Sequence, residues 1–191
     1  MNFIDLKSQQ QKILPNIQNR FERILASSSY IMGQEVYEVE DQLAEYCKVQ
    51  HVITCSSGTD ALLIPLMALG VGPGDAVFTT PFTYVATAEV ISILGATPVF
   101  VDVYDSTFNI DCNKLETAIK NTISDGKLLP KVIIPVDLFG VPARYRIIDK
   151  IAKKYDLTVI SDGAQSFGGK IRDKKVGTFG DITATSFYPA K

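Results

Sequence analysis

Apolar residues recur along the chain with two alternating kinds of spacing. In some stretches they lie three and four residues apart, as on one face of an amphipathic helix. Others are short continuous runs, rich in Val and Ile and bounded by Gly, Pro and polar residues. Such runs are typical of parallel strands that helices cover on both faces. The pattern therefore predicts helices that alternate with strands along most of the chain.

The helical spacing begins near the N-terminus. In the first such stretch Ile13, Ile17 and Phe21 share one face, and we expect Pro15 to interrupt the helix. Pro65 should likewise kink the third predicted helix or delay its start. Helices are predicted over residues 9–28, 34–47, 59–69, 83–94, 111–120 and 145–155.

The strand-like runs lie between these helices. The glycine-rich segment 70–75 is interpreted as a tight turn, and the polar segment 124–131 as a solvated loop. Strand and helix alternate, which predicts a three-layer α/β domain with a mainly parallel sheet. Ligands of such sheets bind beyond the carboxyl ends of the strands. Strands are predicted over residues 51–55, 76–80, 97–103, 131–136, 157–162 and 181–187.

Composition narrows the class of protein. The chain has 191 residues, enough for one domain or one and a part. Its 19 basic and 21 acidic residues give a net charge of −2, which argues against a nucleic-acid partner. The chain has no apolar run of the ~18 residues that span a membrane, and its first residues lack the apolar core of a secretory signal. We expect a cytoplasmic protein with no membrane partner.

Two residue types exclude further classes. The three cysteines form no C-x-x-C pair, so a zinc ribbon, a thioredoxin-type motif and a disulfide framework are not expected. His51 is the single histidine, which rules out a multi-histidine metal site, and we expect no metal. We interpret His51 as a structural residue at the edge of the predicted strand 51–55.

Small polar residues stand where the first predicted strand passes into a helix, in the segment 55–62. The free N–H groups and the dipole of a helix start form a ready anion site, to which Ser and Thr hydroxyls add donors. Plain capping of the helix by Ser57 or Thr59 explains the same residues. Both interpretations stay open. The segment is not a P-loop, because the lysine of that motif is missing.

Three further residues follow predicted strands. Asp162 ends an apolar strand, where a carboxylate could hold a ring nitrogen protonated or simply cap the next turn. Tyr84 could stack on a flat cofactor ring or pack in the core. Lys191 could supply an amine nucleophile or be a solvated chain end. Together with the predicted anion site, these groups match the four needs of pyridoxal 5′-phosphate (PLP): phosphate cradle, stacking partner, carboxylate and lysine.

Four sequence motifs, at 56–62, 83–87, 162–168 and 185–191, follow one another in an order that resembles the DegT/DnrJ/EryC1/StrS family of sugar aminotransferases. Members of this family are PLP enzymes of the aspartate-aminotransferase fold (fold type I). The segments F-I-D-L and Y-I-M-G-Q-E-V also resemble the family's start. The resemblance implies that residues 1–191 form the N-terminal part of the PLP-binding large domain, with a helical segment at 1–30. Members are about twice this long, so we expect a longer polypeptide whose small C-terminal domain is missing here. The four motifs are S-S-G-T-D-A-L (56–62), T-Y-V-A-T (83–87), D-G-A-Q-S-F-G (162–168) and T-S-F-Y-P-A-K (185–191).

The resemblance also implies roles for single residues. Lys191 would bond covalently to the cofactor aldehyde and later act as the general base. Asp162 would pair with the pyridine nitrogen, and Tyr84 would stack on the ring. Gln165 would lie beside the ring hydroxyl. The phosphate would be held by Gly58, Thr59 and Ser186.

The implied reaction is a transamination. Glutamate would give its amino group to the cofactor, which would pass it to a keto group of a UDP- or dTDP-linked sugar in amino-sugar or polysaccharide biosynthesis. Lys191 argues against the related sugar 3-dehydration, because those members carry histidine at this position. A homodimer with shared sites is implied for the full-length protein. A non-catalytic PLP-binding or regulatory protein is the alternative, and a generic nucleotide-binding module is disfavoured by the missing phosphate loop.

Overall fold

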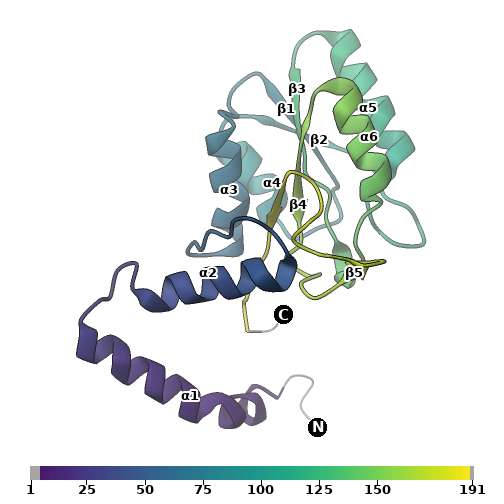
Figure 1. Cartoon of the computed structure of the whole chain (residues 1–191). Coiled ribbons are helices and arrows are strands. Elements are labelled where there is room, and N and C mark those ends of the chain that lie inside the picture. The colour runs from purple at the N-terminus through teal and green to yellow at the C-terminus, as the bar shows by residue number, and fades with distance from the viewer. Residues whose placement is uncertain (1–4, 190–191) are drawn as a thin grey trace. The chain divides into compact units, whose positions relative to one another are not determined.

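The computed structural model describes residues 5–189 and divides the chain into two compact units (Figure 1). The first unit comprises Met1–Thr54 together with Tyr188–Lys191, and the second comprises Cys55–Phe187. Within the described residues, no helix has the length and apolar character that a membrane crossing requires.

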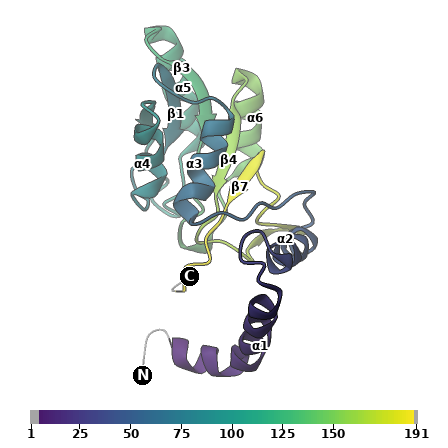
Figure 2. The ribbon, with the colours of Figure 1, turned by 90° about the vertical axis from the view of Figure 1, so that its left-hand side faces the viewer.

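The first unit contains two helices, α1 (Leu6–Ser27) and α2 (Gln34–Cys47). Glu38 of α2 joins them by ion pairs with Arg20 at 2.8 Å and Arg23 at 3.4 Å. The expected interruption at Pro15 is wrong, because α1 continues through it with a bend (Figure 2). Proline removes one N–H donor, and in this exposed helix the carbonyl left without that donor can face solvent.

The strand predicted over residues 51–55 is also wrong. This segment has no regular structure, and the Ile53 side chain is 81% exposed. Both the backbone N–H and the hydroxyl of Thr54 donate to Oε1 of Glu40, at 2.7 and 2.8 Å. A side chain of α2 thus accepts the Thr54 N–H, which in a sheet would donate to a neighbouring strand. His51 is exposed and does not lie at a strand edge, so its structural interpretation is not supported.

The second unit is built on a five-stranded sheet in the order β2-β1-β3-β4-β7. Every neighbouring pair in it is parallel, as the near-continuous apolar runs predicted. All five strands therefore present their carboxyl ends at one edge of the sheet. The strands are β1 (Asp75–Thr79), β2 (Thr97–Phe100), β3 (Leu129–Ile133), β4 (Thr158–Asp162) and β7 (Ile182–Ala184).

Helices cover both faces of this sheet, as Figure 1 shows: α3 and α4 lie on one side, and α5 and α6 on the other. Successive strand residues feed the two resulting cores. Val77 packs in the core beside α3 and α4, whereas Phe78 packs in the core beside α5 and α6. The predicted three-layer α/β architecture is confirmed. The helices are α3 (Gly58–Ala68), α4 (Ala86–Ile93), α5 (Cys112–Asp125) and α6 (Tyr145–Tyr155).

Several boundaries differ from the prediction. Pro65 lies inside α3 and does not delay its start. Helix α5 continues to Asp125, so most of the loop predicted at 124–131 belongs to α5 and β3. Three short elements were not predicted: a 3-10 turn at Leu138–Gly140 and a hairpin of β5 (Lys170–Ile171) and β6 (Lys174–Lys175).

Candidate active site

The first turn of α3 has two backbone donors that the helix itself cannot satisfy. Ser57 caps the helix, because its hydroxyl accepts the Asp60 N–H at 3.1 Å and its carbonyl accepts the Ala61 N–H at 2.9 Å. The amides of Gly58 and Thr59 precede these two, and helix geometry offers them no carbonyl. Capping by Ser57 is therefore real, and it leaves two N–H groups at the positive end of the dipole that can bind an anion.

Ser186 lies against this helix start. A Cβ atom placed on Gly58 would be 2.9 Å from Cβ of Ser186 and 3.3 Å from its Oγ. Only glycine allows so close an approach. The structure thus brings together two residues that are 128 positions apart in the chain (186 − 58 = 128), and it adds a hydroxyl to the two backbone donors.

The loop before α3 is held by Asp60. The hydroxyls of Ser56 and Ser57 both donate to its Oδ2, the latter at 3.1 Å. This carboxylate was not among the predicted site residues. It fixes the loop that presents the Gly58 and Thr59 amides.

Asp162 is the last residue of β4 and is 6% exposed. Thr87 of α4 donates its hydroxyl to Oδ2 at 2.8 Å, and the Ala164 N–H donates to Oδ1 at 3.2 Å. A buried carboxylate at the carboxyl edge of a parallel sheet is suited to hold a proton on a basic ring nitrogen.

The sheet register places Ser186 close to Asp162 along the fold. Asp162 is paired with Ala184 of β7, and the Gly163 N–H donates to the Ala184 carbonyl at 2.8 Å. Ser186 follows two residues later. The predicted anion site and the buried carboxylate therefore lie at the ends of two adjacent strands.

Tyr84 immediately precedes α4. Its carbonyl accepts the backbone N–H of Thr87 at 3.2 Å, whereas the single hydroxyl proton of Thr87 goes to Asp162. The Tyr84 side chain is 69% exposed, which removes core packing as the explanation for this aromatic. Through Thr87, the residue that could stack on a ring is tied to the carboxylate that could bind the ring nitrogen.

Gln165 lies three residues beyond Asp162, and its side chain is exposed. Its Oε1 accepts the backbone N–H of Phe139 at 2.8 Å. Because the amide oxygen is engaged, the NH₂ group is the part that can donate to a ligand. Phe139 itself has φ of 55°, a left-handed conformation that is uncommon for a bulky residue.

Lys191 lies outside the described residues, so its predicted role stays a prediction. Thr87 belongs to the motif at 83–87, but it was not among the predicted site residues. No spacing in the chain predicts its contact with Asp162, which lies 75 positions further along. Within the described residues, no group of three or more His, Cys, Asp or Glu is arranged to hold a metal ion.

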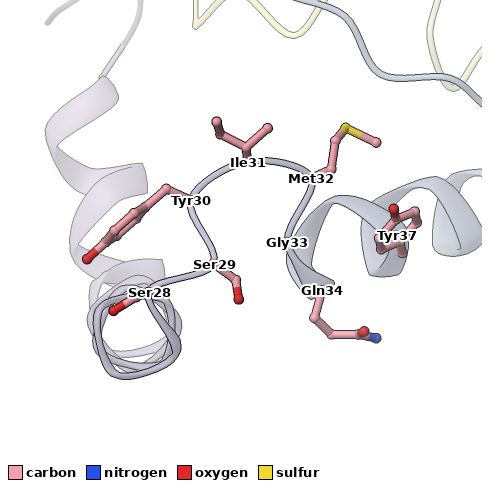
Figure 3. Close-up of a pocket in the computed structure, with 8 residues that line it drawn as sticks. All are labelled: Ser28, Ser29, Tyr30, Ile31, Met32, Gly33, Gln34 and Tyr37. Atoms are coloured by element: carbon pink, nitrogen blue, oxygen red, sulfur yellow. The ribbon is translucent and has the colours of Figure 1, made fainter.

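A hollow of about 590 Å³ lies in the first unit, at the loop between α1 and α2 (Figure 3). Exposed apolar side chains stand along it, Ile31 at 89% and Tyr30 at 66%. None of the predicted site residues that the structure describes lines this hollow.

Comparison with known proteins identifies the family. Residues 11–191 match the model of the DegT/DnrJ/EryC1/StrS aminotransferase family. The chain is 47% identical to a UDP-2-acetamido-2-deoxy-3-oxo-D-glucuronate aminotransferase of Pseudomonas aeruginosa, over all of this chain and 51% of that protein. It is 42% identical to a pleiotropic regulatory protein of Geobacillus stearothermophilus, over 98% of this chain and 49% of that protein. The chain thus spans about half the length of the curated relatives it matches.

Solved structures agree. A DegT/DnrJ/EryC1/StrS aminotransferase from Brucella abortus superposes with a TM-score of 0.97 at 51% identity, over all of this chain and 51% of that one. NtdA from Bacillus subtilis, solved with the cofactor PMP bound, superposes with a TM-score of 0.80 at 34% identity, over 90% of this chain and 37% of that one. The chain therefore belongs to the DegT/DnrJ/EryC1/StrS aminotransferase family.

Proposed function

We propose that this chain is the cofactor-binding half of a PLP-dependent aminotransferase that moves an amino group from glutamate to a keto carbon of a nucleotide-linked sugar. One observation carries the proposal. The buried carboxylate of Asp162 stands at the carboxyl edge of the sheet and is bonded to Thr87, while Ser186 near it touches the start of α3. A structural neighbour at 34% identity, NtdA from Bacillus subtilis, was solved with the cofactor PMP bound, which supports a cofactor of this kind.

The residues fit PLP group by group. The Gly58 and Thr59 amides, with the Ser186 hydroxyl, would hold its phosphate. Asp162 would keep the ring nitrogen protonated, Tyr84 would stack on the ring, and the Gln165 amide would donate to the ring hydroxyl oxygen. When bound, PLP supplies an electron sink that stabilises negative charge on the carbon next to the transferred nitrogen.

Lys191 has two tasks in this proposal. Its amine would condense with the cofactor aldehyde, with loss of water, as nucleophilic lysines do with carbonyl groups. Once displaced by the amino donor, the same amine would take the proton from the donor's α carbon. These tasks are the ones that the family resemblance implies for this position.

The names of the relatives favour a UDP-linked 2-acetamido sugar with a keto group at carbon 3. The Pseudomonas aeruginosa relative acts on a UDP-2-acetamido-3-oxo sugar, and a 40% identical relative of Acidithiobacillus ferrooxidans is named for a UDP-N-acetyl-3-dehydro-glucosamine. More distant relatives are named for dTDP sugars, such as a 33% identical transaminase of Streptomyces venezuelae. We propose that the full-length protein forms a homodimer in which the two subunits share the active sites.

A regulatory protein without turnover is the second candidate, and one observation favours it. The Geobacillus stearothermophilus relative, at 42% identity, carries the name of a pleiotropic regulatory protein. The two candidates differ in turnover and not in cofactor binding.

The test is an assay of the full-length protein with glutamate and a panel of UDP- and dTDP-keto sugars. We expect glutamate alone to release about one equivalent of 2-oxoglutarate per site, and continuous release only when a keto sugar is also present, with the highest rate for the UDP-2-acetamido-3-keto sugar. Cofactor binding without any 2-oxoglutarate would favour the regulator. A dTDP sugar as the best acceptor would overturn the substrate class but leave the reaction standing.

A further inference from the structure

A second aspartate is buried beside the candidate site, and the proposed function does not use it. Asp137 follows β3 by four residues, and none of its surface is exposed. Its Oδ1 accepts the Ala143 N–H at 2.8 Å and the Tyr145 hydroxyl at 2.7 Å, and its Oδ2 accepts the Ser166 hydroxyl at 2.9 Å. Three donors therefore converge on one carboxylate that makes no contact with solvent.

These bonds reach both sides of Asp162. The Tyr145 hydroxyl is also hydrogen-bonded to Ser161, the residue just before Asp162. Ser166 closes the turn after Asp162, because its N–H donates to the Gly163 carbonyl at 3.1 Å. The backbone N–H of Asp137 donates to the Asp162 carbonyl at 3.0 Å. Asp137 thus contacts the strand end before Asp162, Asp162 itself and the turn after it.

The direction of the hydrogen bonds follows from the donors present. Burial raises the pKa of Asp137, and the nearby charge of Asp162 also raises it, whereas the bonds from Ala143, Tyr145 and Ser166 lower it. Burial raises the pKa of Tyr145 well above its usual range, so this phenol keeps its proton. Tyr145 donates its O–H to a hydrogen bond with Asp137, so Ser161 must donate to Tyr145.

We propose that Asp137 is a positioning residue, which holds the turn of Asp162 and Gln165 in the orientation that binds the cofactor ring. This inference rests on the proposed function. Gln165 lies directly before Ser166, whose hydroxyl Asp137 holds, and its Oε1 accepts the N–H of Phe139, two residues after Asp137. One carboxylate and the segment around it therefore fix both side chains that are assigned to the ring.

If Asp137 only stabilised the fold, replacing it should affect cofactor binding no more than replacing another buried aspartate. Asp75 provides the comparison within the same unit. It is 9% exposed, accepts the Gly72 N–H at 2.9 Å and forms an ion pair with Lys131 at 2.9 Å. Asp75 opens β1 and so lies at the amino edge of the sheet, opposite the edge of Asp162. Its substitution removes a buried carboxylate but leaves the turn untouched.

The experiment compares Asp137→Asn, Ser166→Ala and Asp75→Asn with the unchanged protein, by titration with PLP and by circular dichroism of the bound cofactor. We expect Asp137→Asn and Ser166→Ala to weaken PLP binding about tenfold, as removal of an outer-shell partner does in metal sites. The cofactor's dichroic band should shrink in both. Asp75→Asn should leave the PLP affinity and the dichroic band unchanged, even if it lowers the midpoint of unfolding. Unchanged affinity and dichroism in Ser166→Ala would overturn the proposal, including when Asp137→Asn does not fold.

Amide hydrogen exchange of the cofactor-free protein separates this inference from the proposed function. The Ala164 N–H is bonded to Asp162 and the Ser166 N–H to Gly163. In Ser166→Ala and Asp137→Asn, the Ala164 amide should exchange about tenfold faster than in Asp75→Asn, because a bond to a charged group has been lost. If the unchanged protein binds no PLP, the proposed function fails, and this readout still decides the positioning role. Equal exchange in all variants contradicts it.

Discussion

The hydroxyl of Thr87 lies 2.8 Å from Oδ2 of Asp162, and this bond joins residues that are 75 positions apart in the chain. Thr87 stands in the first turn of α4, where its backbone N–H donates to the carbonyl of Tyr84 at 3.2 Å. Asp162 ends β4, the neighbour of β7. Thr87 therefore contacts both residues, the proposed ring carboxylate through its hydroxyl and the backbone of the proposed stacking residue through its N–H.

Replacing Thr87 tests this connection. Thr87→Val keeps the shape of the side chain but removes the donor, so a buried carboxylate loses a hydrogen bond worth about 1.5–3 kcal/mol. We expect weaker PLP binding and lower turnover, together with a lower free energy of unfolding. Thr87→Ser retains the hydroxyl, so its PLP affinity, turnover and free energy of unfolding should lie close to those of the unchanged protein. Equal PLP affinities of the Val and Ser variants would show that the bond does not position Asp162.

Gly58→Ala tests the close approach of Ser186 to α3. The new Cβ would lie 2.9 Å from Cβ of Ser186, so the loop after β7 must shift, at a cost of about 1–3 kcal/mol. We expect reduced affinity for inorganic phosphate and for PLP. Gly72→Ala is the matched control, because its Cβ would meet its nearest atom, the Leu94 carbonyl oxygen, at an ordinary 3.8 Å. Phosphate affinity that falls equally in both variants would rule out a specific effect at the helix start.

Asp162→Asn removes the charge while keeping the size of the side chain. The ring nitrogen would lose the group that holds its proton, so we expect turnover with glutamate to fall by at least about a hundredfold. Covalent attachment of the cofactor should survive, because it depends on Lys191. The measurement is 2-oxoglutarate release alongside the absorbance of the bound cofactor. Near-normal turnover would mean that another carboxylate serves the ring.

Acid should weaken the contact between α5 and α6. Glu116 accepts hydrogen bonds from Lys154 at 2.7 Å and from Tyr155 at 3.0 Å, and these bonds lower the pKa of Glu116 to about 2. A lowered folded-state pKa gives stability that is present above the ordinary value of 4.5 and is lost as pH falls toward 2.

Glu116→Gln should therefore be slightly less stable than the unchanged protein at pH 7. The two free energies of unfolding should converge as the pH falls from about 4.5 to 2. The difference is small, because Lys154 is exposed and Glu116 is partly exposed, and ion pairs so accessible to solvent contribute weakly. Denaturant titrations across this pH range provide the check. A difference that grows toward low pH would contradict the assignment.

The layered fold could be read from the sequence because each buried strand is an apolar run flanked by turn residues. The run 131–136, for example, gave β3 to within three residues of either end. Segment 51–55 also contains β-branched residues in succession, yet it forms no strand. Strand formation needs a neighbouring strand to accept its hydrogen bonds, and here Glu40 binds Thr54 instead. Local composition does not contain that information.

At the candidate site, too, local sequence predicts some residues, whereas others depend on which strands are neighbours. Gly58, Tyr84 and Asp162 could be singled out because each follows or begins an element at the edge where ligands bind. Thr87 and Asp137 could not be assigned a role, since their partners depend on which strands are neighbours. The order β2-β1-β3-β4-β7 brings Asp137 beside Asp162, and no spacing in the chain predicts that order.

The central claim is that this chain binds PLP covalently through its last residue. The direct measurement is reduction of the purified full-length protein with borohydride in the presence of PLP, followed by peptide mapping of the label. We predict a yellow protein that becomes irreversibly labelled at Lys191 and at no other lysine, and a Lys191→Ala variant that takes no label. A colourless protein, or a label on a different lysine, would contradict the account.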